Sequence, residues 1–260
     1  MWMDEDYFRY LWRCKRLFIH SINYRNMRKN LYRVLLAAVL LMGASSAAWA
    51  QRSESFKANG HTYTMSGTLN IREYKANATG KVTFTNVPSN YEEFEEVYTQ
   101  FLGKTPYGTA AMMPMAMAIY GRDRAEGEKC IRLINYPSNV NSVLSILKEK
   151  FGTSQYAPAN DSYHQPYLPA AVLEGATPEN GYSPKSPYTV NMKASVNKHQ
   201  DMQLYDGRVM YIYLMGKGWD TEQRSVEIIQ VNEGDLFKVF NCPSLYTQCK
   251  RIKGTWEGLK

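Results

Sequence analysis

The sequence predicts an α+β fold in which antiparallel strands, from an N-terminal hairpin and a C-terminal group, flank about three helices and a long irregular Tyr/Pro-rich lobe. Three observations carry this prediction. Apolar residues alternate with period two over residues 61–71, they recur at helical spacing between residues 89 and 152, and β-branched and aromatic residues dominate from residue 188 onward. Strands at both ends with helices between them are typical of α+β domains, and the sequence shows no internal repeat.

The N-terminal hairpin is predicted from two strand patterns. One face of residues 61–71 carries His61 and four apolar side chains, while the other face is polar. Gly67 interrupts the apolar face and could mark a bulge. A turn through residues 77–80 then leads to a second strand over residues 81–87.

Three helices are expected next. The first starts at a capping box, Ser89-x-x-Glu92, and ends at Gly103. The second has Thr105 as its N-cap and Pro106 in its first turn, and it is apolar all round, which predicts a buried helix. The third covers residues 139–151.

Between the second and third helices, residues 130–136 resemble a buried strand that begins at Cys130. Residues 152–188 hold six of the eleven prolines and five tyrosines, with a single short apolar run. Long connections are usually either functional or disordered, and frequent aromatic residues argue against disorder. We therefore expect an ordered, irregular lobe.

Further strands are predicted at residues 188–196, 209–215, 225–231, 236–240 and 250–256. Residues 209–215 are apolar on both faces, as in a central strand. The strands at 225–231 and 236–240 flank a short glycine-containing loop, which is hairpin spacing.

The segment from Met27 to Ala50 has the organisation of a secretory signal peptide. A basic start precedes the apolar run 34–42, and Ala48-Trp49-Ala50 is a cleavage site of the small-residue type. The chain thus divides into residues 1–26 (an over-extended start or a cytoplasmic tail), a signal peptide at 27–50, and one α+β domain at 51–260, with 51–88 as a candidate hairpin subdomain. We expect a periplasmic or secreted protein cleaved after Ala50. The alternative is an uncleaved anchor, but the apolar run is shorter than the roughly 20 residues of a spanning helix.

The basic net charge belongs mainly to the leader. The whole chain has a formal charge of +7, whereas residues 51–260 contain 23 basic and 21 acidic residues, a net of +2. This excess is too small to predict nucleic-acid binding. Contact with a membrane is expected only through the signal peptide or an uncleaved anchor.

Enzymatic signals are sparse, which weighs against catalysis. The chain has no G-x-S-x-G, H-E-x-x-H, Walker or C-x-x-C motif, and we predict neither a metal nor a cofactor. The alternative is a hydrolase of an envelope polymer, in which Asp161 and His164 act together, with Asp220 as a further candidate. Cys130 is discounted as a nucleophile, because its apolar context raises a thiol pKa.

The favoured hypothesis is a non-catalytic domain that binds an envelope glycan, peptide or protein. Tyrosine and tryptophan offer large contact areas with a polar tip, and they are enriched at binding surfaces. The candidate ligand-binding residues are therefore the aromatic side chains of the lobe and of the turn after the central strand, together with one arginine: Tyr163, Tyr167, Tyr182, Trp219 and Arg224. The alternative for that turn is that Trp219 packs across the lobe, while Asp220 and Arg224 pair locally.

Cysteine usage adds one prediction that stays open at this point. In an oxidising compartment Cys242 and Cys249 could close a short disulfide loop, although a sequence cannot show whether their Cα atoms approach closely enough.

Several phrases between residues 106 and 256 resemble a family of secreted proteins of unknown function from Bacteroidetes. They are PYGTAAMMPMAMAIYG, YLPAAVLEGATPENGYSP with PYTVNM, GWDTEQRSVEI, and FKVFNCPSLYTQCK. The resemblance implies an exported protein of a Gram-negative envelope or its surroundings. It carries no mechanism, so no catalytic or binding residue follows from it.

Overall fold

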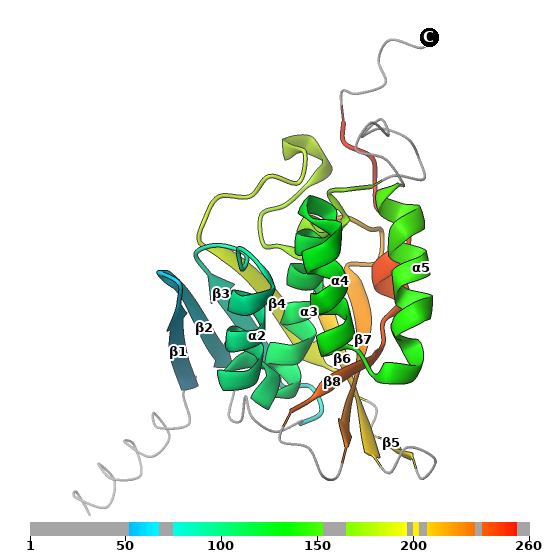
Figure 1. Ribbon diagram of the computed structural model, residues 1–260. Helices are drawn as coiled ribbons and strands as arrows, with labels where there is room; N and C mark the ends of the chain where they lie inside the picture. The colour runs from blue at the N-terminus through cyan, green and yellow to red at the C-terminus, as the bar shows by residue number, and fades with distance from the viewer. Residues whose placement is uncertain are drawn as a thin grey trace, which may run out of the picture. The chain divides into compact units, whose positions relative to one another are not determined.

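The computed structural model describes residues 52–67, 75–152, 165–196, 200–202, 207–231 and 236–253. Gln51–Lys260 forms one compact unit. Its described strands build a single antiparallel sheet, covered on one face by helices α2–α5 (Figure 1). This confirms the predicted α+β class. None of the helices in these ranges is long and apolar enough to cross a membrane.

The sheet joins the two strand groups that the sequence places at opposite ends of the domain. The described strands are β1 (Arg52–Ala58), β2 (His61–Gly67), β3 (Thr79–Phe84), β4 (Tyr188–Ala194), β5 (Gln200–Met202), β6 (Gly207–Met215), β7 (Gln223–Val231) and β8 (Lys238–Asn241). Their order is β1-β2-β3-β4-β6-β7-β8, and β5 pairs with β6. Because β3 pairs with β4 along its whole length, β1–β3 belong to the same continuous sheet as the C-terminal strands.

The pairing of the strands confirms some of the predicted strands and not others. The β2–β3 and β7–β8 hairpins are antiparallel as expected, and β6 lies inside the sheet. Strand β1 was not predicted, because its sequence RSESFKA lacks an apolar alternation, and it lies at the sheet edge against β2 alone. Residues 250–253 form no strand, and the rest of the predicted last strand lies outside the described residues.

The two sheet faces differ in chemistry because successive side chains point to opposite sides. Apolar side chains such as Tyr63, Val82 and Val190 face the helices and are fully buried. The opposite face of β1–β4 carries a row of hydroxyl residues in register, with Ser55 bonded to Thr64 and Thr83 bonded to Thr189. The core therefore lies between the sheet and the helices.

Helices α2 (Tyr91–Gln100), α3 (Pro106–Arg122) and α5 (Val140–Phe151) confirm the three predicted helices. Thr105 caps α3 as expected, with Pro106 in the first turn. The start of α2 differs by one residue, because Asn90 accepts the backbone N–H of Glu93 while the Glu93 carboxylate accepts that of Ser89.

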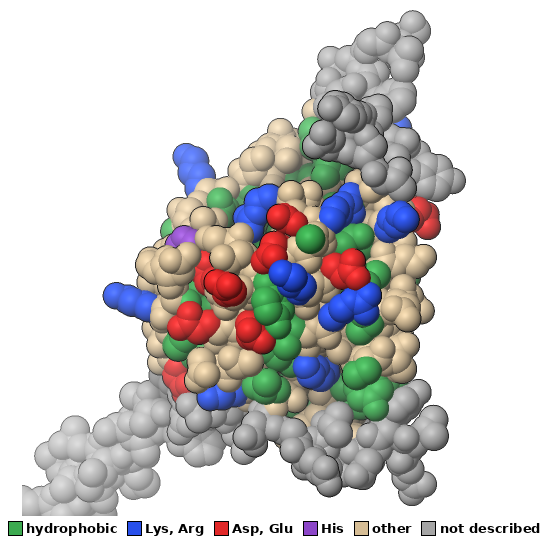
Figure 2. All heavy atoms as spheres, viewed as in Figure 1, with side chains coloured by type: hydrophobic (Ala, Val, Ile, Leu, Met, Phe, Trp, Pro, Cys, Tyr) green, Lys and Arg blue, Asp and Glu red, His purple; other side chains and the backbone are tan. Residues whose placement is uncertain are grey.

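The predicted strand at residues 130–136 is wrong, because α4 (Arg124–Ile134) takes this place. Asp123 caps the helix by accepting the backbone N–H of Glu126, and the buried residues Cys130, Ile131 and Ile134 lie on one helical face. The described helices therefore number four, and on the face that they form acidic and basic side chains are interspersed (Figure 2).

A buried carboxylate ties the N-terminal strands to α2. Glu93 is 4% exposed, and its two oxygens accept bonds from the Tyr63 hydroxyl (2.7 Å), His61 Nδ1 (2.6 Å) and the Ser89 backbone N–H (2.8 Å). Asn59 Nδ2 donates to Glu93 Oε2 at 3.4 Å. Burial raises the pKa of Glu93, but these hydrogen bonds outweigh it and lower the pKa below its ordinary value. Glu93 therefore remains charged at neutral pH.

Candidate functional site

The described part of the lobe, residues 165–188, is ordered as predicted but has little regular structure. Two short 3-10 turns, Leu168–Val172 and Pro178–Asn180, are its only helical segments in this range. The first turn packs against α3, and a bridge between Leu173 and Val190 joins the lobe to β4. The lobe thus lies at the edge where α3 meets the sheet (Figure 1).

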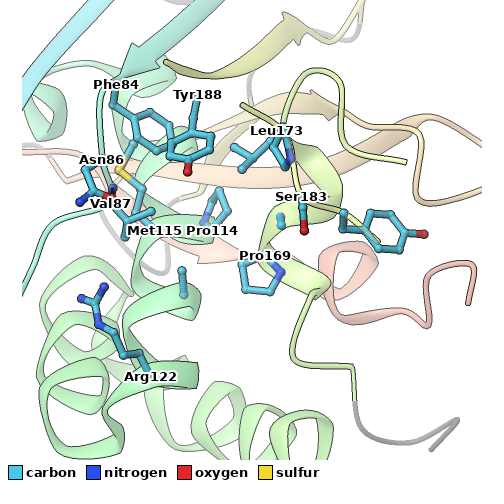
Figure 3. Close-up of a pocket in the computed structure, with 14 residues that line it drawn as sticks. Phe84, Asn86, Val87, Pro114, Met115, Arg122, Pro169, Leu173, Ser183 and Tyr188 are labelled. Atoms are coloured by element: carbon cyan, nitrogen blue, oxygen red, sulfur yellow. Dashed lines mark hydrogen bonds between the residues drawn. The ribbon is translucent and has the colours of Figure 1, made fainter. Parts of the chain in front are cut away.

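A pocket of about 400 Å³ opens between α3, the lobe and the adjoining ends of β3 and β4 (Figure 3). Its lining is mainly apolar: Phe84, Val87, Pro114, Met115, Ala118, Pro169, Ala170, Leu173, Tyr182, Pro184 and Tyr188. Three polar residues, Asn86, Arg122 and Ser183, complete it. This size and an apolar wall with few polar groups are typical of small-ligand sites.

Local sequence explains why the pocket has these walls. Proline cannot donate a backbone hydrogen bond, and Pro114 stands inside α3, where it lines the pocket. Phe84 and Tyr188 are register partners on β3 and β4, and their rings lie 5.6 Å apart, which closes the sheet side. The lobe prolines Pro169 and Pro184 supply rigid apolar walls on the other side.

Tyr182 separates this pocket from the turn after β6. Its ring stacks on that of Tyr167 with centroids 5.0 Å apart and an interplanar angle of 4°, and its hydroxyl donates to the Lys250 carbonyl oxygen at 2.7 Å. The side chain is 3% exposed, and burial is the main cause that raises its pKa. Tyr182 is therefore a fixed, neutral wall, held in a left-handed backbone conformation with φ of 54°.

A second hollow, of about 580 Å³, surrounds the turn after β6 and includes Trp219, Asp220, Arg224 and Lys250. Trp219 is 4% exposed, its indole N–H donates to the Thr247 carbonyl oxygen at 3.1 Å, and Arg224 Cζ lies 4.4 Å from the ring centroid. This is the packing arrangement that the sequence left as an alternative, since no open ring face remains for a sugar. Asp220 pairs with Lys250 at 3.0 Å rather than with Arg224.

The predicted site residues fall in different places. Tyr182 lines the first pocket, Tyr167 supports it from behind, and Trp219 and Arg224 belong to the second hollow. Asp161, Tyr163 and His164 lie outside the described residues. The side chain of Asp220 is 98% exposed, so it is a solvated surface carboxylate. Among the described residues no group of three metal-ligating side chains gathers.

The predicted disulfide is not formed, since Cys130, Cys242 and Cys249 are all buried free thiols. Cys242 Sγ lies 2.9 Å from the Tyr246 hydroxyl, and the Cys249 thiol donates to Gln165 Oε1 at 3.5 Å. Burial raises the pKa of each thiol to about 12. The thiols therefore stay protonated and unreactive at neutral pH, as expected for Cys130.

Sequence reasoning missed Arg122 and the walls from α3. Arg122 Nη2 donates to the carbonyl oxygens of Pro88 and Ser89, both at 2.8 Å, which fixes the guanidinium at the pocket edge. The only sequence signal was the unusual all-round apolar character of α3, which also fits an ordinary buried helix.

Comparison with known proteins gives one result. A protein-family model described as "Domain of unknown function (DUF6935)" matches residues 86–253. That range holds the four helices, the lobe and β4–β8, but it begins after β3. No curated protein and no solved structure matches the chain.

Proposed function

The chain belongs to this family of unknown function, and on that premise we propose that it is a non-catalytic, exported binding protein whose lobe pocket receives an apolar group of an envelope or extracellular ligand. The single observation that carries the proposal is the preformed pocket of about 400 Å³ at the junction of α3, the sheet and the lobe. Fixed walls reduce the ordering cost of binding, so such a pocket suits ligand binding without a large rearrangement.

The lining favours an apolar group over a sugar ring. Eleven of its fourteen residues are apolar, and the rings of Phe84 and Tyr188 are tilted by 46° rather than laid side by side as a flat platform. A sugar hydroxyl that entered this pocket would lose hydrogen bonds to water and find few partners, which costs free energy. An aliphatic or aromatic group gains about 25 cal/mol for each Å² of apolar surface buried.

Export is the second part of the proposal. It rests on the leader-like organisation of residues 27–50. Mass spectrometry of the natural protein should find Gln51 as its first residue. An intact N-terminus upstream of Gln51 would contradict export with cleavage.

Filling the pocket is expected to abolish binding. Ala118 lines the pocket from α3 and is partly exposed, so Ala118→Trp should place an indole in the cavity while the core stays intact. The neutral, apolar dye N-phenyl-1-naphthylamine, followed by fluorescence, should bind the natural protein and bind Ala118→Trp at least about tenfold more weakly, a loss of about 1.4 kcal/mol.

Ala125→Trp is the matched control, because Ala125 is exposed on α4 and lines neither of the two pockets described. It should bind the dye as the natural protein does. Equal dye affinity for all three proteins, with circular dichroism spectra unchanged, would show that the pocket is not the site.

A further inference from the structure

The charge at the pocket edge identifies a class of ligand. We propose that the lobe pocket selects ligands with an apolar body and a terminal carboxylate, and that Arg122 binds this carboxylate. The inference rests on the proposed function, because it requires the pocket to be a binding site. It adds a specificity-determining residue that no sequence motif indicates.

Arg122 has donors to spare. A guanidinium carries five N–H groups. In the described structure only Nη2 of Arg122 donates, to the carbonyl oxygens of Pro88 and Ser89, while Nε and Nη1 have no acceptor. No carboxylate of the described residues forms an ion pair with Arg122. The neighbouring cation Arg124 differs, because it lies over the Tyr120 ring and donates to Phe151 and Gly152.

The guanidinium is also held in place. Two carbonyl oxygens at 2.8 Å restrain it, and Figure 3 shows the side chain extending from α3 toward Asn86 and Val87 at the pocket edge. A restrained guanidinium loses less conformational entropy when it binds a carboxylate. Charge-assisted bonds of this kind are about twice as strong as bonds between neutral groups.

Among the described residues that line the pocket, none carries a competing negative charge. Its described lining contains one cation, Arg122, and no aspartate or glutamate. Asn86 accepts the Val87 backbone N–H through Oδ1, so its amide NH₂ stays available as a second neutral donor. One cation beside apolar walls is complementary to an amphiphile with a single anionic end.

Two classes of ligand combine an apolar body with a terminal carboxylate. A medium-chain fatty acid presents an alkyl chain and a carboxylate, and a peptide that ends in a bulky apolar residue presents a side chain next to its free C-terminal carboxylate. The two differ in the amide group beside the carboxylate, which Asn86 and Ser183 could bind in the peptide.

The test uses matched ligands on the mature protein. Displacement of N-phenyl-1-naphthylamine is measured at neutral pH with decanoate and decan-1-ol, and with acetyl-Ala-Leu-Phe as the free acid and as the C-terminal amide. The acid of at least one pair should bind about tenfold or more tighter than its neutral partner, because a hydrogen bond to a charged group is stronger than one between neutral groups. Whichever acid binds more tightly identifies the source.

Arg122→Gln should bring the acid-to-neutral affinity ratio close to one, and Arg132→Gln should leave that ratio unchanged, because Arg132 is paired with Glu128 on the exposed face of α4. Equal affinity of acid and neutral partner for the natural protein would overturn the inference and leave the proposed function standing. If Arg122→Gln does not fold, the inference is tested by the natural protein alone, through the ratio of its affinities for the acid and for the neutral partner. If the natural protein does not bind the dye at all, the proposed function itself is refuted.

Discussion

Replacing Glu93 with alanine should lower the free energy of unfolding by about 3–5 kcal/mol, the range found when one partner of a buried ionic network is removed. The Tyr63 hydroxyl, His61 Nδ1 and the Ser89 backbone N–H all point at this buried carboxylate. Without it they would remain buried or half-buried with no acceptor, and each such group costs about 1–3 kcal/mol. Urea denaturation followed by circular dichroism measures the loss.

Glu96→Ala is the control for this variant, since Glu96 is exposed on the same helix, α2, and should change stability by less than about 0.5 kcal/mol. The pH dependence gives a second readout. Because the folded-state pKa of Glu93 is lowered, its contribution is complete above the ordinary carboxyl range and is lost as pH falls through the folded-state pKa. Equal losses for Glu93→Ala and Glu96→Ala would contradict the network.

Gly127→Ala should be similarly damaging, because α3 and α4 approach too closely for a side chain at this position. A Cβ atom on Gly127 would lie 2.0 Å from Tyr120 Cα and 2.3 Å from Tyr120 N. These are backbone atoms of α3, so relief requires the helices to separate. We expect a loss of about 3 kcal/mol or more, at the upper end of overpacking costs, despite the roughly 1 kcal/mol that alanine gains over glycine in a helix.

Gly121→Ala is the matched control within α3. Its Cβ would meet ring atoms of Phe151 at 2.9 and 3.1 Å, and a ring can shift where a backbone cannot. Thermal unfolding should therefore place Gly121→Ala near the natural protein and Gly127→Ala well below it. A Gly127→Ala variant as stable as the natural protein would show that the two helices are not packed this closely.

Local signals explain which elements the sequence could predict. The Thr105 side chain accepts a backbone N–H of the first turn, and the ring of Pro106 fixes φ at a helical value. Both signals are local, so the start of α3 was predicted correctly. The strand predicted at residues 130–136 was wrong because Cys130, Ile131 and Ile134 form a short apolar run that fits a strand as well as a helix. The cap at Asp123 was the signal that could have decided it.

The pocket could not be predicted from the sequence, and the physical reason differs from that for residues 130–136. Its walls come from segments between Phe84 and Tyr188, and all but three of its residues have the apolar side chains of an ordinary core. Met115 and Met113 are both buried, and only packing decides that Met115 borders the pocket while Met113, two residues earlier, does not. Of the proposed aromatic residues that the structure describes, Tyr182 alone lines it.

The most direct test of the pocket as a binding site is a methyl spectrum of protein labelled with ¹³C at its methionine methyl groups, titrated with N-phenyl-1-naphthylamine. Met115 lines the pocket, whereas Met112, Met113 and Met117 on the same helix do not. The Met115 signal should shift and saturate with the fluorescence titration, while the other three move much less, and Ala118→Trp should remove the shift. A bound dye that leaves Met115 unmoved would contradict the account.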